Sequence, residues 1–211
     1  MDIATVDKLL TTTRSVRQRL DLTRPVEPEV IERCLEIAVQ APTGGNVCRY
    51  HFVVITDPAK RATIGDWYRQ SFAKAYPEQV LAERRKTHGR DVASWTYLVE
   101  HLQDVPVLII PCIEGRPEDD ISLNRLAGFY GNILPAAWSL MLALRARGLG
   151  SAWTTLVLRH DKDLAKLLQM TANITPAALL PVAYFTGDDF HPARRVPARE
   201  RTYWNIWGAV R

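Results

Sequence analysis

One segment near the N-terminus constrains the fold most, because a helix, a tight loop and a strand follow one another along it. Glu27-Pro28 places proline in the first turn of a helix, whose apolar residues recur on one face. These residues are Val30, Ile31, Cys34, Leu35, Ala38 and Val39. The helix is predicted to end near Gln40, since Ala41-Pro42-Thr43-Gly44-Gly45-Asn46 is rich in helix-breaking residues. Phe52-Val53-Val54-Ile55 then predicts a short buried strand.

The rest of the chain is also predicted as helices and short strands. Helical patterns cover residues 3–12, a segment that opens at Asp57-Pro58, residues 122–147 and residues 161–170. Strands are predicted at Val105–Ile113, Ser151–Leu158 and Leu179–Phe185. Residues 60–103 are charged, rich in aromatic residues and weakly periodic, so we interpret them as a helical, variable lid.

Prolines leave two details of these elements open. Pro106 and Pro111 indicate that the strand at Val105–Ile113 lies at a sheet edge or has an irregular ladder. Pro135 lies inside the pattern at 122–147, so that helix either restarts or kinks there. Its end is clearer, because Arg145 and Arg147 occupy the last turn and Gly148 follows as a cap.

The length of 211 residues predicts one domain spanning 1–211, or a domain with a lid. No apolar run approaches the roughly 18 residues that cross a bilayer, and Met1–Thr5 does not resemble an export signal. The three cysteines form no CxxC pair, so neither a disulfide framework nor a zinc site is indicated. We therefore expect a cytoplasmic protein in which Cys34, Cys48 and Cys112 are buried as small hydrophobic residues.

The charge leaves a polyanion-binding role open. The net charge is +4, and 21 of the 27 basic residues are arginine, whose planar guanidinium suits phosphate and carboxylate groups. Two groups of arginines lie at opposite ends of the chain: Arg14, Arg17 and Arg19, and then Arg194, Arg195, Arg199 and Arg201. These arginines either meet at one anion or form a solvated surface.

Several enzyme classes lack their sequence signals. The histidines show no HxxxH or HxH spacing, so no metal site is expected. The chain contains no GxSxG, no GxxxxGK[ST] and no GxGxxG, which leaves no signal for an α/β-hydrolase, a P-loop enzyme or a Rossmann site.

Three segments carry residues suited to a ligand, although each also has a purely structural interpretation. Thr13-Arg14-Ser15-Val16-Arg17 alternates cations with hydroxyls, as a phosphate site or a surface turn does. In Ala41–Asn46 the glycines permit close approach of a ligand and Asn46 offers a donor and an acceptor, but a helix-to-strand turn has the same composition. Gly148–Thr155 combines close backbone approach with hydroxyls, or is simply a helix cap.

Taken together, these segments resemble the nitroreductase family of FMN-dependent oxidoreductases. The resemblance extends over nearly the whole chain, from Arg14-Ser15-Val16-Arg17 through the Ala41–Asn46 loop and Gly148-Leu149-Gly150-Ser151 to Arg195-Val196-Pro197. It implies an α+β fold with a central mixed, mainly antiparallel sheet flanked by helices. It also implies a C-terminal arm, at about 192–211, that is exchanged in a homodimer; Tyr203, Trp204 and Trp207 supply the aromatic surface of this arm.

The same resemblance implies which residues contact FMN. Ser15 and Arg17 match contacts to the flavin, Asn46 matches the asparagine at the pyrimidine edge, and Arg195 matches a late basic residue that binds phosphate. The full set expected to bind the cofactor is Arg14, Ser15, Arg17, Asn46, Gly150, Thr154, Thr155, Arg194 and Arg195. Within it, Arg17 is a candidate for stabilising charge near flavin N1 and Thr154 for controlling flavin N5. No side-chain acid or base is assigned.

The activity implied is FMN-dependent oxidation of NADH or NADPH, with hydride passed in a ping-pong cycle to a nitroaromatic, a quinone or a related small aromatic. Alternatives are reductive dehalogenation or flavin breakdown on the same fold, and a basic module that binds a polyanion. No nucleic acid or membrane partner is expected under the first interpretation. Departures from the family pattern occur at Thr13, at Cys48-Arg49-Tyr50 and at Asn132, and the sequence decides neither the nicotinamide nor the acceptor.

Overall fold

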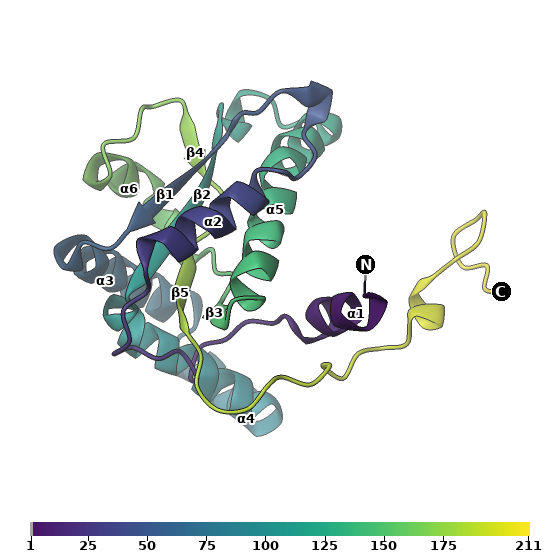
Figure 1. Cartoon of the computed structure of the whole chain (residues 1–211), viewed down its shortest axis with the longest axis horizontal. Helices are drawn as coiled ribbons and strands as arrows, with labels where there is room; N and C mark the ends of the chain where they lie inside the picture. Colours follow the sequence, from purple (N-terminus) through teal and green to yellow (C-terminus); the bar gives the residue numbers. More distant parts are fainter. Residues whose placement is uncertain (1) are drawn as a thin grey trace. The chain divides into compact units, whose positions relative to one another are not determined.

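Five short strands form one sheet in the computed structural model of the protein, which describes residues 2–211 (Figure 1). The strands are β1 (Tyr50–Ile55), β2 (Val107–Glu114), β3 (Leu149–Ser151), β4 (Ile174–Pro176) and β5 (Leu180–Tyr184). They lie in the order β1-β2-β5-β3, β4 also pairs with β2, and these ladders are antiparallel. Ser15 forms a parallel bridge to Ser151, so the predicted mixed, mainly antiparallel sheet is confirmed.

Helices flank this sheet, which makes the fold α+β as predicted (Figure 1). They are α2 (Pro28–Ala38), α3 (Pro58–Ala75), α4 (Glu78–His101), α5 (Leu123–Arg145) and α6 (Asp161–Leu167), and a further helix, α1 (Ile3–Thr12), precedes them in the chain. All except α4, whose start the sequence does not predict, begin close to the residue expected. Pro28, for example, lies in the first turn of α2, where its missing N–H has no intrahelical partner to lose.

The chain divides into two compact units, which are described separately. The larger unit, Arg14–Gly187, contains the sheet and α2 to α6. The smaller unit consists of Met1–Thr13 and Asp188–Arg211. Within the smaller unit, the Asp2 side chain caps α1 by accepting from the Ala4 N–H, and Lys8 pairs with Asp189 at 2.8 Å. That the tail is exchanged in a dimer remains a prediction.

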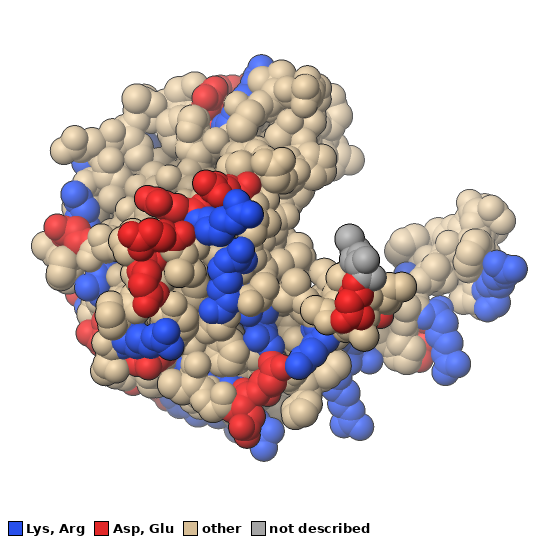
Figure 2. Space-filling model, viewed as in Figure 1, with Lys and Arg blue, Asp and Glu red and all other residues tan. Residues whose placement is uncertain are grey.

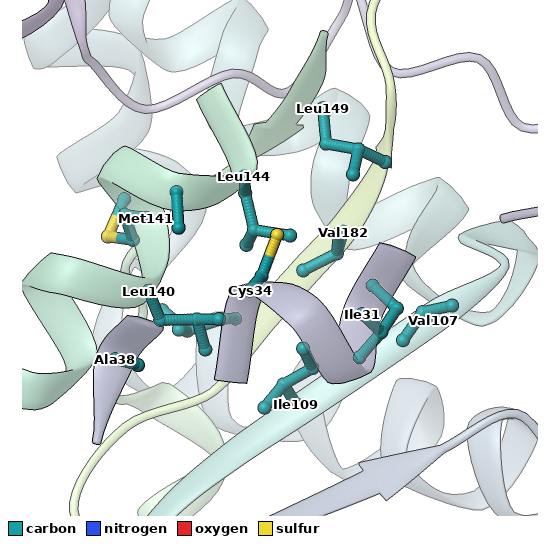
Figure 3. Packing of buried hydrophobic residues seen from close by; sticks show 12 residues of the cluster. Ile31, Cys34, Ala38, Val107, Ile109, Leu140, Met141, Leu144, Leu149 and Val182 are labelled. Atoms are coloured by element: carbon teal, nitrogen blue, oxygen red, sulfur yellow. The ribbon is translucent and has the colours of Figure 1, made fainter. Parts of the chain in front are cut away.

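The main core of the larger unit lies between the sheet and the helices α2 and α5 (Figure 3). Its buried side chains include Ile31, Cys34, Ala38, Val107, Ile109, Leu140, Met141, Leu144, Leu149 and Val182. Successive strand residues point to opposite faces, so Leu108 and Ile110 are buried on the other face of β2. Burial on both faces explains why β2 is apolar at nearly every position.

Of the two alternatives for β2, an edge position or an irregular ladder, the structure shows the irregular ladder. β2 has β1 on one side and both β5 and β4 on the other. Pro111 falls between the residues paired with β5, which end at Ile109, and those paired with β4, which begin at Cys112. Its carbonyl accepts from the Ala177 N–H at 2.8 Å, so its nitrogen also faces this gap, where no ladder N–H is needed.

The strand predicted at Ser151–Leu158 was wrong in its extent. Strand β3 ends at Ser151, Thr154 forms an isolated bridge with Leu179, and Leu156–His160 is a 3₁₀ helix, η4. A short apolar run suits a helical turn as well as a strand, and Val157 is fully buried from η4. The three-residue strand β4 is too short to give a periodic signal, and the sequence missed it.

Helix α5 runs through Pro135 as one helix, which rules out a restart, one of the two alternatives left open by the sequence. Gly148 was predicted as the cap of α5, but the C-cap is Ala146, and Gly148, three residues beyond Arg145, has the left-handed φ of +77° that glycine favours. Among the described residues, α5 is long and apolar enough to cross a membrane by length and composition, with a mean hydropathy of 1.3, contrary to the expectation that no segment is. Core packing accounts for part of this apolarity, because Ile133, Leu140 and Leu144 are fully buried.

The predicted helical region at 60–103 forms two helices, α3 and α4, that separate at Tyr76-Pro77. His88 interrupts α4 with a non-helical φ of −132° and ψ of 39°. Phe72 of α3 packs with Leu81 and Val92 of α4 in a small core of their own. The two helices are therefore packed against each other, and a role as a lid remains a prediction.

The cysteines differ in burial. Cys34 and Cys112 are fully buried, as expected, and burial raises the pKa of the Cys112 thiol to about 12. The prediction was wrong for Cys48, which is exposed in the loop between Asn46 and β1. Its neighbours Val47 and Arg49 are exposed too, because nothing in the larger unit covers this short loop among the described residues.

Candidate functional site

The segment that begins at Arg14 lies directly against strand β3. The Val16 N–H donates to the Ser151 carbonyl at 2.8 Å, and Ser15 forms its parallel bridge to the same residue. Gly150 makes this approach possible, because a Cβ there would lie 2.9 Å from the Val16 Cβ and 3.1 Å from Leu20 Cδ2. Two segments far apart in the sequence are thus brought together by a glycine.

Thr154, three residues beyond β3, is held by both its backbone and its side chain. Its N–H and carbonyl pair with Leu179 at 3.1 and 2.8 Å. Its hydroxyl donates to the Tyr68 hydroxyl of α3 at 3.1 Å. The side chains of Thr154 and Tyr68 are both buried, with 9% and 4% of each residue exposed. This buried polar pair connects α3 to the end of the β3 segment.

Arg17 supplies the charge of the same cluster. Burial lowers the pKa of the Arg17 guanidinium, while the nearby Tyr68 and Asp91 act in the opposite direction. Burial also raises the pKa of Tyr68, against the Thr154 hydrogen bond and the charge of Arg17. An arginine in a protein stays protonated, so the cluster combines a half-buried cation with two protonated hydroxyls.

The loop that carries Asn46 is held by helix α5. The Gly44 N–H donates to Asn132 Oδ1 at 2.7 Å, and Asn132 Nδ2 donates to the Gly128 carbonyl at 2.6 Å. Asn46 ends the short 3₁₀ helix η1 (Gly44–Asn46) with a φ of 55°, a left-handed conformation that asparagine tolerates. The Asn46 side chain is exposed, and among the described residues it does not contact the Arg17 cluster.

The residues predicted to bind a cofactor are therefore distributed over three places. Ser15, Arg17, Gly150 and Thr154 are brought together beside β3, with Arg14 and Thr155 exposed next to them. Asn46 lies on its own loop. Arg194 and Arg195 are exposed in the smaller unit.

Sequence reasoning missed Tyr68, Asp91 and the bridging role of Asn132. Tyr68 is one of many aromatic residues in the weakly periodic region at 60–103, and no motif distinguishes it from the others. Its position on α3 relative to Thr154 depends on how α3 packs against the residues after β3, which the sequence pattern does not encode. The departure from the family pattern at Asn132 is the one signal that the sequence offers.

The visible surface of the larger unit bears on the polyanion alternative. Figure 2 shows basic and acidic side chains interspersed there, and α2 contributes Glu29, Glu32, Arg33 and Glu36. Arg33 pairs with Glu36 at 2.6 Å. Mixed charge of this kind lacks the continuous basic stripe by which proteins follow a polyanion, so this face does not favour that alternative.

Comparison with known proteins identifies relatives in redox enzymology. The chain is 28% identical over 185 residues to the 5,6-dimethylbenzimidazole synthase of Rhodospirillum rubrum, covering 85% of this chain and 80% of that one. It is 24% identical over 205 residues to the NADH dehydrogenase of Thermus thermophilus, covering 90% and 91%. The solved structure of oxidized iodotyrosine deiodinase bound to FMN and 3-iodo-L-tyrosine has the same fold, with a TM-score of 0.70 and 22% identity over 94% of this chain and all of that one.

The model of the nitroreductase family matches residues 10–184, which include the Arg14–Arg17 segment, the Asn46 loop, Tyr68 and Thr154. This match covers most of the chain and agrees with the fold, and the relative from Thermus thermophilus is an oxidoreductase by name. The protein belongs to the nitroreductase family.

Proposed function

We propose that the protein is an FMN-dependent oxidoreductase that takes hydride from NADH or NADPH and reduces a nitroaromatic, a quinone or a related small aromatic. The observation that carries the proposal is the cluster beside β3. In this cluster Arg17 supplies a half-buried cation, and Thr154 and Tyr68 supply two buried hydroxyls. Family membership supplies the redox class, and this cluster supplies donors of the kind that a flavin requires.

The donor set fits the chemistry of FMN. The edges of the isoalloxazine ring carry carbonyl oxygens and ring nitrogens that accept hydrogen bonds, and the phosphate is an anion. Arg17, Thr154 and the backbone around Gly150 would hold the ring, and Asn46 would meet its pyrimidine edge. Arg14, Ser15, Thr155, Arg194 and Arg195 would complete the contacts to ribityl and phosphate. When bound, FMN accepts a hydride from the nicotinamide and passes it to the acceptor.

Arg17 has a defined electrostatic task in this proposal. Reduction leaves negative charge near flavin N1 and O2, and a guanidinium held partly out of water stabilises it more strongly than one in bulk solvent. The burial that lowers the Arg17 pKa is the same burial that reduces screening by water. The protein therefore contributes position and charge, and no side-chain acid or base is assigned a proton transfer.

The visible spectrum of the purified protein tests this function. We expect flavin absorbance, either as purified or after incubation with FMN, and its anaerobic loss on addition of one nicotinamide at a faster rate than with the other. Regeneration of the absorbance by a nitroaromatic or a quinone completes a ping-pong cycle, in which donor and acceptor occupy one site in turn. A protein that stays colourless with excess FMN contradicts the proposal.

The contribution of the C-terminal arginines has its own test. Arg195→Ala should weaken FMN binding about tenfold or more, because hydrogen bonds to a charged group contribute about 1.5–3 kcal/mol. Arg211→Ala, at the exposed end of the chain, is the matched control and should leave the FMN dissociation constant unchanged. Equal effects of the two substitutions would mean that the arginines act as a general surface charge.

A second candidate function is reductive dehalogenation or flavin breakdown. The Thr154 hydroxyl, buried and aligned by Tyr68, favours it, because a donor at flavin N5 influences whether electrons leave singly or as hydride. The iodotyrosine deiodinase and the 5,6-dimethylbenzimidazole synthase are family relatives that make these activities worth testing. A turnover screen with halophenols, together with flavin consumption under oxygen, distinguishes them from nitro or quinone reduction.

We also propose a homodimer in the cytoplasm as the functional form. Each of the two units, taken separately, exposes apolar side chains that support a dimer. Leu134 and Trp138 lie on one face of α5, and Trp204, Ile206 and Trp207 lie in the C-terminal tail. Apolar groups of this size on a soluble protein usually cover a partner.

A further inference from the structure

Two buried hydroxyls in the cluster share a single hydrogen bond. The Thr154 hydroxyl donates to the Tyr68 oxygen at 3.1 Å, and both residues are more than nine-tenths buried. Each hydroxyl carries one proton and can also accept. One bond uses one of the two protons, and no acceptor for the Tyr68 O–H occurs among residues 2–211. The pair therefore retains one donor that the described protein does not satisfy.

The direction of this hydrogen bond determines what Thr154 offers to a ligand. When Thr154 donates to Tyr68, a lone pair on the Thr154 oxygen is left to accept. When Tyr68 donates to Thr154, the Thr154 proton is left to donate outward. Exchange between the two arrangements requires only rotation of each O–H about its C–O bond, and no covalent bond forms or breaks.

The surroundings keep both hydroxyls protonated and in place. Burial raises the pKa of Tyr68, so its phenol remains neutral at physiological pH despite the nearby Arg17. The backbone of Thr154 is paired in both directions with Leu179, at 3.1 and 2.8 Å, which leaves its side chain few alternative positions. Tyr68 lies within a helical turn of Ile64 and Phe72, both buried, so its ring is also held by packing.

We propose that Tyr68 is a positioning residue that lets Thr154 follow the redox state of a bound flavin. The proposal rests on the function given above, in which Thr154 faces flavin N5. Oxidised N5 is a hydrogen-bond acceptor, so with oxidised flavin Tyr68 would donate to Thr154 and Thr154 would donate to N5. Reduced N5 would carry a hydrogen and donate to Thr154, so Thr154 would donate to Tyr68 across the same 3.1 Å contact.

The electrons of the reaction pass between the nicotinamide and the flavin, and neither hydroxyl of the pair is oxidised or reduced. Hydride transfer to a bound flavin would move two electrons and one hydrogen from the nicotinamide, whose C–H bond would break as the N5–H bond formed, so that the nicotinamide would be oxidised and the flavin reduced. Thr154 and Tyr68 exchange no proton with either partner. Their effect is to satisfy N5 equally well before and after the transfer, without moving a backbone atom.

In the Tyr68→Phe variant, Thr154 can satisfy oxidised flavin N5 but not reduced N5 without losing a hydrogen bond. The Thr154 proton can still reach oxidised N5 in the variant, but with reduced N5 it has lost its acceptor and remains buried and unpaired. Leaving a buried donor unsatisfied costs about 1–3 kcal/mol, so the ratio of reduced to oxidised flavin should fall about tenfold. For a two-electron couple, a tenfold change lowers the midpoint potential by about 30 mV.

The test is the midpoint potential of bound FMN in four proteins: wild type, Tyr68→Phe, Thr154→Val and the double variant. We expect Tyr68→Phe to lower the potential by about 30 mV in the wild-type background and to have no effect where Thr154 is already Val. Tyr184→Phe is the matched control, since it also removes a bonded tyrosine hydroxyl, one that donates to Glu27 at 2.6 Å, and should leave the potential unchanged. An unchanged potential in Tyr68→Phe, or the same shift in both backgrounds, would overturn the proposal.

A second measurement needs no variant and covers the case in which Tyr68→Phe does not fold. Reduced-minus-oxidised infrared spectra of the FMN-loaded wild type, prepared with ring-labelled tyrosine, report whether a tyrosine C–O stretch changes. We expect an isotope-sensitive band, because one tyrosine changes from donor to acceptor on reduction; its absence would contradict the proposal. If the wild type binds no FMN at all, the proposed function fails, whereas intact binding without these responses refutes only the role of Tyr68.

Discussion

Gly150 illustrates at the residue scale how the absence of a side chain builds the site. Gly150→Ala would place a methyl group 2.9 Å from the Val16 Cβ and 3.0 Å from its Cγ1, closer than packed carbons approach. Val16 is flanked by Ser15 and Arg17, so any shift moves both. We expect the free energy of unfolding to fall by about 1–3 kcal/mol, measured by urea denaturation, and FMN binding to weaken in parallel.

The control for this prediction is a glycine with open space around it. Gly89, in α4, has no atom within 4 Å of the position that an alanine methyl group would take, so Gly89→Ala should leave stability unchanged or raise it by about 0.5–1 kcal/mol through helix propensity. If both alanine variants behaved alike, the tight approach at Gly150 would not be the cause of its effect.

Cys112 gives a pH dependence of stability with a definite sign. Its thiol pKa is about 12 in the folded protein because of burial, compared with 9.0 when unperturbed. The unfolded chain therefore loses this proton first as the pH rises, and the stability that Cys112 contributes is intact below pH 9.0 and decreases between pH 9.0 and about 12. The slope approaches about 1.4 kcal/mol per pH unit.

Comparison of wild type with Cys112→Ala isolates this contribution. Denaturation curves at pH 8 and pH 10 should show a smaller loss of stability with pH in the variant, although the variant starts lower because of its cavity. The same loss in both proteins would show that other groups account for the alkaline dependence.

Asn132 connects two elements, since its side chain bridges helix α5 and the Gly44–Asn46 turn. Asn132→Ala removes the acceptor of the Gly44 N–H at 2.7 Å, and the turn that presents Asn46 loses its tie to the helix. A lost hydrogen bond of this kind costs about 0.5–1.5 kcal/mol, so we expect FMN affinity to fall about two- to tenfold by fluorescence titration. Asn124→Ala, in the exposed first turn of α5, should not change it.

Elements with a strong periodic pattern could be predicted from the sequence, and those that depend on partners could not. The apolar stripe of α2 is a local feature, and it appears in the structure as expected, with Ile31, Cys34 and Ala38 buried. Strand β3 ends at Ser151, which pairs with Val182 of β5, and the next residue of β5 in this register is Pro181, which has no N–H to donate. That limit comes from the partner strand and not from the residues that follow Ser151. The contact between Tyr68 and Thr154 spans 86 positions and depends on the packing of α3, so no local pattern predicts it.

At the scale of the whole molecule, exposed apolar surface is the feature that one chain leaves unexplained. Within the larger unit, Ile121 and Leu123 at the start of α5 are 76% and 85% exposed, and Leu134 and Trp138 continue along the helix. Within the smaller unit, Ile206 and Trp207 are 71% and 89% exposed. Transferring such side chains out of water stabilises an interface by about 25 cal/mol per Å² of apolar area, which favours association of two chains.

The mass in solution tests this association. We expect wild type to elute at twice the chain mass of 23.9 kDa by light scattering, and the double variant Leu134→Glu with Trp138→Glu to elute at the mass of one chain and to bind FMN more weakly. Buried glutamates at an interface would remain charged and unpaired, which opposes its formation by several kcal/mol. Val80→Glu, at a 40% exposed position of α4 in the same unit, is the matched control and should keep the dimer mass. A wild-type protein that runs at 23.9 kDa with one FMN bound per chain would show instead that a single chain completes the site.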